Sequence, residues 1–197
     1  FGTAGQRCTS LGNLIVHEDI YEDFMERFME KVRSTKIGDS MSNDDVLYGP
    51  MLSEKYALDF LDGLEMCESS GARRIYGEGR ITTNSSPTGF VADAESGVYM
   101  WPHVYVDVTD EMECFHEEIF GPAVTVVKAK DFDHALYLAN ASPYGLSSAI
   151  YTNDRLEAYR FKTGIKAGMT GINNSTTGAE AHLSLIHISE PTRPVLI

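Results

Sequence analysis

Basic residues and long apolar runs are both scarce in this sequence, and each scarcity excludes a class of partner. Lysine and arginine total 16 against 29 aspartates and glutamates, so the formal net charge is −13 at pH 7. Nucleic acids and anionic membrane surfaces bind basic patches. A helix that spans a bilayer needs about 20 consecutive apolar residues, and the chain has no such run. We therefore expect a protein that binds no nucleic acid and no membrane.

Cysteine is scarce as well: the chain has three, at positions 8, 67 and 114. An odd number of widely spaced cysteines matches neither a disulfide framework nor the ligand spacing of a metal site. Free thiols are typical of a reducing compartment, so we predict a cytoplasmic protein that holds no metal ion. The sequence begins with Phe1 and nothing in it resembles a signal peptide, and we expect it to start inside a longer reading frame.

What the chain does have is an alternation of strand and helix patterns. Hydrophobic residues make up 43% of its 197 residues, enough for the core of one domain. Strands are predicted at residues 11–17, 72–76, 98–108, 123–129, 147–151 and 168–173, and helices at 20–32, 53–67, 131–140 and 154–161. This order predicts an α/β fold with a mainly parallel open sheet and helices on both faces.

Apolar stripes indicate which side of each early helix faces the core. The predicted core-facing residues are Ile20, Phe24, Phe28 and Val32 in the first helix, and Tyr56, Phe60, Leu64 and Cys67 in the second. We therefore interpret Cys67 as a core residue. Gly77 and Gly79 follow a predicted strand but precede no helix, so we interpret them as a turn and not as a phosphate loop. We expect His103 to be a strand or surface residue and not a metal ligand.

Cys8 lies between small and polar residues, directly ahead of the β-branched run that begins the first predicted strand. A loop that leads into a strand is a common place for a reactive group, and the glycines at positions 2 and 5 allow close backbone approach. Cys8 is thus a candidate exposed nucleophile. The alternative is an inert, buried thiol, since free cysteine is among the most buried residue types.

Two motifs give the chain a family resemblance. Residues 5–8 resemble the G-Q-x-C nucleophile motif of the aldehyde dehydrogenase superfamily, and residues 118–122 resemble its E-x-F-G-P motif. The two occur in the family's order and at about its separation, and residues 48–51 and 142–146 resemble further family landmarks. The resemblance covers residues 1–183. It implies a truncated, catalytic-domain-like α/β fold from an NAD(P)-dependent aldehyde dehydrogenase.

The resemblance also implies roles for three residues. Cys8 would be the nucleophile that forms a thiohemiacetal and then a thioester, with its own backbone N–H as one oxyanion donor. Glu118 would bind the nicotinamide ribose hydroxyls of NAD or NADP, and Phe120 would pack near the nicotinamide ring. The substrate would be a small-molecule aldehyde and the parent protein a homo-oligomer. The alternatives are a solvated charge for Glu118 and a core residue for Phe120.

Both ends of the resemblance imply a partial domain. The family's dinucleotide-binding half, its glutamate base and its oxyanion-hole asparagine precede the cysteine, so we expect this chain alone to be inactive. The family segment at residues 171–183 normally continues into P-F-G-G, but here residues 183–193 resemble a translated transposase-type sequencing adaptor. We therefore expect residues 1–183 to be a partial catalytic domain and residues 184–197 to be a non-native tail.

Two functions from other classes remain open. Cys8 could serve a cysteine hydrolase together with a distant histidine such as His134, although no local C-G-S-C-W signature surrounds it. Alternatively the chain could be a non-catalytic α/β binding module in which Cys8 is inert. The rate of thiol alkylation would separate these, because only an activated cysteine reacts fast.

Overall fold

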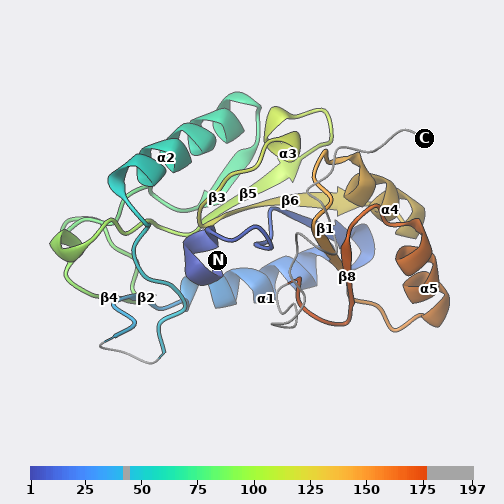
Figure 1. Cartoon of the computed structure of the whole chain (residues 1–197), viewed down its shortest axis with the longest axis horizontal. Coiled ribbons are helices and arrows are strands. Elements are labelled where there is room, and N and C mark those ends of the chain that lie inside the picture. The colour runs from blue at the N-terminus through green and yellow to red at the C-terminus, as the bar shows by residue number, and fades with distance from the viewer. Residues whose placement is uncertain (42–44, 177–197) are drawn as a thin grey trace.

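The structure, a computed structural model, describes residues 1–41 and 45–176 of the chain. Its main sheet has four strands in the order β1 (Asn13–His17), β6 (Ala123–Ala129), β5 (His103–Val108) and β3 (Arg73–Tyr76). The first three are parallel, and β3 is antiparallel to β5 at the edge (Figure 1). The mainly parallel open sheet predicted from the sequence is confirmed.

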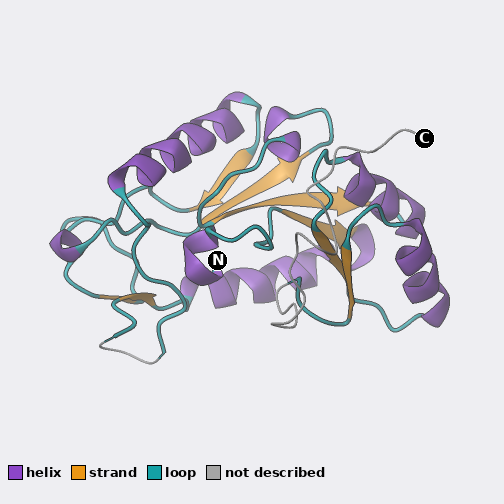
Figure 2. Cartoon of the chain, viewed as in Figure 1, coloured by secondary structure: helices purple, strands orange, loops and turns teal. Residues whose placement is uncertain are grey.

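Four more strands in the described residues form two separate pairs. β2 (Ile37–Gly38) pairs with β4 (Phe90–Val91), and β7 (Ser147–Ile150) pairs with β8 (Met169–Ile172), both in parallel. The sequence predicted β7 and β8 as strands but not that they would hydrogen-bond with each other instead of with the main sheet. The helices are α1 (Tyr21–Arg33), α2 (Glu54–Ser69), α3 (Glu113–His116), α4 (Phe132–Ala141) and α5 (Arg155–Gly164), with short 3-10 turns at Gly2–Gly5, Glu18–Ile20 and Ala94–Ser96 (Figure 2).

Helix α1 covers one face of the main sheet. The buried residues of this layer are Val16, Met25, Met29, Val32, Val104, Val106, Val124 and Val126. The predicted stripe was wrong in part, because Ile20 is 55% exposed and Phe24 and Phe28 are only half-buried. Two methionines, each one position after a phenylalanine, occupy the buried side, which rotates the helix by one residue. Flexible, unbranched Met side chains fill irregular gaps well.

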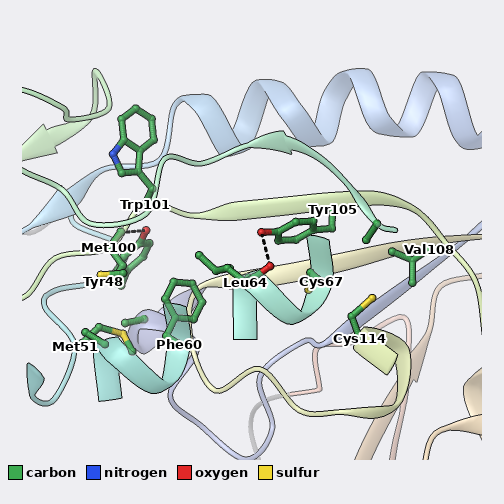
Figure 3. Close-up of a cluster of buried hydrophobic side chains, with 14 of the residues drawn as sticks. Tyr48, Met51, Phe60, Leu64, Cys67, Met100, Trp101, Tyr105, Val108 and Cys114 are labelled. Atoms are coloured by element: carbon green, nitrogen blue, oxygen red, sulfur yellow. Dashed lines mark hydrogen bonds between the residues drawn. The ribbon is translucent and has the colours of Figure 1, made fainter. Parts of the chain in front are cut away.

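Helices α2, α3 and α4 cover the other face, opposite α1 (Figure 1). The buried side of α2 carries Ala57, Phe60, Leu64 and Cys67, so the core position predicted for Cys67 is confirmed. Tyr56 is 38% exposed and Ala57 takes its place. In this core Tyr48 Oη donates to the Met100 carbonyl at 3.0 Å (Figure 3), whereas the buried Trp101 Nε1 has no hydrogen-bond partner among the described residues.

The turn predicted at Gly77 and Gly79 is present, and it explains His103. Both glycines have positive φ, at 105° and 88°, and the Gly79 N–H donates to His103 Nε2 at 3.0 Å. His103 Nδ1 donates to the Trp101 carbonyl at 2.9 Å, so both ring nitrogens are used by a neutral imidazole. His103 is a fully buried strand residue. The expectation that it would be a strand residue is confirmed.

Candidate active site

The loop that carries Cys8 has an unusual backbone. Thr3, Ala4 and Gly5 all lie in the left-handed region, with φ of 55°, 54° and 67°. For the two residues that are not glycine this conformation costs about 1 to 3 kcal/mol each, so surrounding contacts must hold it in place. Ala4 is buried in the core cluster on the α2 side, whereas Cys8 is exposed. The loop is thus anchored at its start and presents its thiol to solvent.

The two motifs found in the sequence touch each other through their glycines. A Cβ atom added to Gly5 would overlap the carbonyl oxygen of Gly121, and one added to Gly121 would overlap the ring of Phe60. Only glycine permits approach this close. Close packing therefore explains why glycine occupies both motif positions. The contact places the Cys8 loop beside the loop that carries Glu118 and Phe120.

Sheet topology accounts for this proximity. The Cys8 loop leads into β1 and residues 117–122 lead into β6, and these two strands are parallel neighbours. Segments that precede parallel neighbours lie at the same edge of a sheet. His103, the first residue of β5, donates its N–H to the Pro122 carbonyl at 2.8 Å at the same edge. The candidate site therefore lies at the amino ends of three strands.

Helix α2 packs against the loop that carries Glu118 and Phe120. Beyond the contact between Phe60 and Gly121, a Cβ added to Gly63 would lie 3.2 Å from the Ile119 side chain, so the helix and the loop pack closely. The N–H of Glu118 points to Tyr144 Oη at 3.4 Å, which brings residues 142–146 to the site. The Glu118 side chain is exposed, yet desolvation by the protein around it raises the pKa of its carboxyl.

Phe120 is 39% exposed although the glycine and proline that follow it are buried. An exposed aromatic ring and an exposed carboxyl on one loop are groups that can bind a flat, hydroxyl-bearing ligand such as a nicotinamide riboside. The chain's own residues therefore fit the nicotinamide end of a dinucleotide. In this structure Phe120 is not a core residue.

Two residues that hold the Cys8 loop were given no role by sequence reasoning. Gln6 Oε1 accepts the N–H of Leu52 at 3.0 Å, which ties the loop to the segment that leads into α2. Thr176 Oγ1 donates to the Thr9 carbonyl at 2.9 Å, which brings the segment after β8 to the loop. Gln6 belongs to the G-Q-x-C motif, so the motif was the signal that could have identified it.

The site offers no partner for a cysteine hydrolase in His134. This residue lies in the first turn of α4, beyond the carboxyl end of β6, and its Nδ1 accepts the Lys130 N–H at 3.2 Å. At about 3.3 Å per residue, the 7 residues of β6 put its two ends roughly 20 Å apart. His134 and Cys8 are therefore at opposite edges of the sheet.

Two features are absent from the described residues, 1–41 and 45–176. No group of three or more His, Cys, Asp or Glu residues gathers there in a way that could hold a metal ion. In the same residues no helix combines the length and the apolar character needed to cross a membrane.

Comparisons with known proteins agree with the family resemblance found in the sequence. Residues 1–185 match the sequence profile of the aldehyde dehydrogenase family. The alpha-ketoglutarate semialdehyde dehydrogenase of Haloferax volcanii is 37% identical over 183 residues, which cover 93% of this chain and 36% of that protein. The chain thus spans about a third of the length of the curated relatives it matches.

Solved structures are similar over the same region. An NAD-dependent aldehyde dehydrogenase from Sinorhizobium meliloti matches with a TM-score of 0.80 and 32% identity, over 90% of this chain and 33% of that one. A betaine aldehyde dehydrogenase from Staphylococcus aureus in complex with NAD+ matches with a TM-score of 0.80 and 27% identity, over 88% of this chain and 33% of that one.

Proposed function

The chain belongs to the aldehyde dehydrogenase family, and from that premise we propose that it is part of an enzyme that oxidises a small-molecule aldehyde to a carboxylic acid with NAD or NADP. The observation that carries the proposal is the contact between Gly5 and Gly121, which sets the loop of Cys8 against the loop of Glu118 and Phe120. The loop of the proposed nucleophile thus lies beside the loop of the proposed cofactor-binding residues, which supports an oxidation through a thioester.

Cys8 is the proposed nucleophile. Its thiolate attacks the aldehyde carbon, forms a carbon–sulfur bond and moves the carbonyl π electrons onto oxygen. The backbone N–H of Cys8 is the proposed donor to that oxyanion. After the carbon has lost its hydride, Cys8 carries the acyl group as a thioester. Water then releases the carboxylic acid and the thiol is restored. The exposure of Cys8 on an anchored loop supports this role.

Glu118 and Phe120 are the proposed cofactor-binding residues. When bound, the nicotinamide supplies the hydride acceptor. The Glu118 carboxylate would accept hydrogen bonds from the ribose hydroxyls, and the exposed ring of Phe120 would support the flat face of the nicotinamide. Because the pKa of Glu118 is raised, the carboxylate is available above that pKa and its binding contribution falls as the pH drops through it.

We propose that residues 1–183 form part of the catalytic domain of a longer, cytoplasmic, homo-oligomeric parent protein, and that residues 184–197 are not native to it. The share of its relatives that the chain spans supports the first point. The tail lies outside the described residues. Inspection of the source nucleotides tests the second point, because a genomic sequence that continues through codon 184 would contradict it.

The test of function uses the full-length parent. Purified protein is mixed with NAD or NADP and with alpha-ketoglutarate semialdehyde or betaine aldehyde, the aldehydes in the names of two relatives, and reduced cofactor is measured. We expect turnover that is lost in Cys8→Ala. Turnover that survives in this variant would refute the nucleophile assignment, and ester hydrolysis without cofactor would favour the hydrolase.

A further inference from the structure

Asn13 lies between the two segments that carry the candidate site. It is the first residue of β1, the strand that follows the Cys8 loop, and it is half-buried. Its Nδ2 donates to the Phe115 carbonyl at 2.9 Å. Phe115 lies in α3, the helix that leads directly into Glu117 and Glu118. One side chain therefore joins the strand after the proposed nucleophile to the helix before a proposed cofactor-binding residue.

The other end of the Asn13 amide is held by the neighbouring strand. Thr125 of β6 pairs with Asn13 across the sheet, is 2% exposed, and donates its hydroxyl to Asn13 Oδ1. The Gly12 carbonyl lies 3.4 Å from the same hydroxyl, but it already accepts the Thr125 N–H at 3.0 Å. A hydroxyl has one hydrogen to donate, and the closer acceptor is the Asn13 amide.

These two partners explain why the side chain is an asparagine. A carbonyl only accepts, so Phe115 needs the amide nitrogen, and the Thr125 hydroxyl then meets the amide oxygen. An ionised aspartate has the same shape but would turn an oxygen toward the Phe115 carbonyl, and a leucine has a similar size but offers neither group. The last carbonyls of a helix have no partner within it, so the Asn13 bond also satisfies one of them at the end of α3.

The Asn13 bond fixes one end of the loop that carries Glu118, and the packing of Gly121 against Gly5 fixes the other. Glu118 lies between these two attachments. Both attachments lead to the segment that carries Cys8, because Gly5 precedes this cysteine and Asn13 follows it. The separation of Cys8 and Glu118 is therefore determined from both ends of the loop.

We propose that Asn13 is a positioning residue that holds Glu118 at the distance from Cys8 that hydride transfer needs. The inference rests on the proposed function, in which Cys8 holds the carbon that loses the hydride and Glu118 holds the ribose of the cofactor. Transfer requires reacting atoms about 3 to 3.5 Å apart, and a misplacement of about 1 Å costs about a hundredfold in rate. The attack of Cys8 on the aldehyde does not involve Glu118, so Asn13 acts on the hydride step alone.

The experiment uses the full-length parent and measures the hydride step and the thiol separately. Asn13→Leu removes both hydrogen bonds at nearly constant size. We expect single-turnover hydride transfer to fall about tenfold, while the rate at which iodoacetamide alkylates Cys8 changes less than about twofold. Thr125→Val is the matched control, because it removes the partner of Asn13 Oδ1 and keeps the bond to Phe115. Its hydride transfer should fall much less than that of Asn13→Leu.

Asn13→Asp adds a pH dependence that a purely structural role would not produce. Once protonated, the introduced carboxyl has a hydrogen to donate to the Phe115 carbonyl and an oxygen left to accept the Thr125 hydroxyl. The carbonyl in front of it and its partial burial favour the protonated form. The ratio of the variant's hydride-transfer rate to that of the wild type should therefore rise as the pH falls from about 8 to about 5. The ratio cancels the titration of Glu118, which both proteins share.

Failure of the proposed function and failure of this inference give different results. A wild-type parent that shows no Cys8-dependent reduction of cofactor would overturn both. Where that activity is present, hydride transfer in Asn13→Leu within about twofold of the wild type, or an equal loss in Thr125→Val, would overturn the inference alone. A rate ratio for Asn13→Asp that does not change with pH would do the same, and this variant decides the matter if Asn13→Leu folds poorly.

Discussion

Cys8 lies exposed on a loop ahead of β1, whereas Cys67 and Cys114 lie in the core between α2 and the sheet. The loop is held by contacts that leave its cysteine free: a buried Ala4, the glycine contact with Gly121 and the hydrogen bond of Gln6. In the core, the packed helices instead enclose both thiols, which are 0% and 2% exposed. The same functional group can therefore meet a substrate in one region and is shielded from it in the other.

The difference shows that the backbone, and not the residue type, decides what each thiol can do. A cysteine on an exposed loop is reached by molecules as large as an aldehyde with its cofactor. A thiol enclosed in the core is shielded from molecules of that size and contributes through packing. Each prediction below changes a residue of the loop, of the core or of the contact between them, and compares it with a matched variant or condition.

The largest effect is expected when the exposed thiol is removed. In the full-length parent, Cys8→Ala should lower aldehyde-dependent cofactor reduction by at least about a thousandfold, because alanine cannot form the covalent adduct. Cofactor binding, measured by fluorescence titration, should remain. The matched control is Cys67→Ala, which should keep most of the activity. Equal losses in the two variants would remove the functional distinction between the regions.

A fall in pH should lower the stability of the buried core more than it changes the loop of Cys8. Burial lowers the pKa of His103 to about 4, against about 6.5 when unfolded. At a pH between these two pKa values, His103 is protonated in the unfolded chain and neutral in the folded chain. His103 therefore contributes its full stabilisation of the folded state above pH 6.5 and loses that contribution as the pH falls toward 4. From pH 7 to pH 4.5, the free energy of unfolding of the chain should fall by about 2 kcal/mol on this account.

The measurement is urea unfolding at the two pH values, with His103→Gln as the comparison. Glutamine does not titrate, so the variant should lack this share of the pH dependence even if it is less stable at pH 7. The physical reason is that Nε2 of His103 must accept the Gly79 N–H and cannot do so when protonated. An unchanged pH dependence in the variant would contradict the assignment.

Glu118→Gln tests whether the loop beside Cys8 positions the cofactor. We expect the rate of hydride transfer in a single turnover to fall about tenfold while substrate binding changes less, because a displaced ring costs rate through geometry. Glu117→Gln is the matched control, an adjacent exposed carboxylate with no proposed contact. If both variants behave alike, Glu118 acts only as surface charge.

The sequence singled out the candidate site more directly than it did the elements around it. The family motifs identified Cys8, Glu118 and Phe120, and each motif immediately precedes a predicted strand. That β1 and β6 are neighbours, and hence that the motifs meet at one edge, depends on long-range pairing that periodicity does not report. In open α/β sheets ligands more often bind at the carboxyl ends of strands, so that general rule points to the edge opposite the candidate site.

The elements that were missed are short or depend on tertiary contacts. The strands β2 and β4 have two residues each and α3 has four, too few for a pattern to repeat. The periodicity of α2 predicted that Cys67 is buried, whereas α3, which carries the buried Cys114, was not predicted. The predicted buried face of α1 differs from the observed one by one residue, because methionine and phenylalanine are equally apolar in a periodicity pattern.

The smallest effect is expected at Gln6, the residue that joins the two regions. Gln6→Met keeps the length of the side chain but removes the acceptor of the Leu52 N–H, and a lost hydrogen bond of this kind is worth about 1 kcal/mol. In the parent we expect kcat to fall about fivefold with little change in the KM for cofactor. Gln6→Glu keeps an acceptor oxygen at the same position and should recover most of the rate.

Hydrogen exchange at the Leu52 amide is the second readout: it should become faster in Gln6→Met and stay slow in Gln6→Glu. If Gln6→Glu is as impaired as Gln6→Met while its Leu52 amide stays protected, the hydrogen bond is not what holds the Cys8 loop in its reactive position.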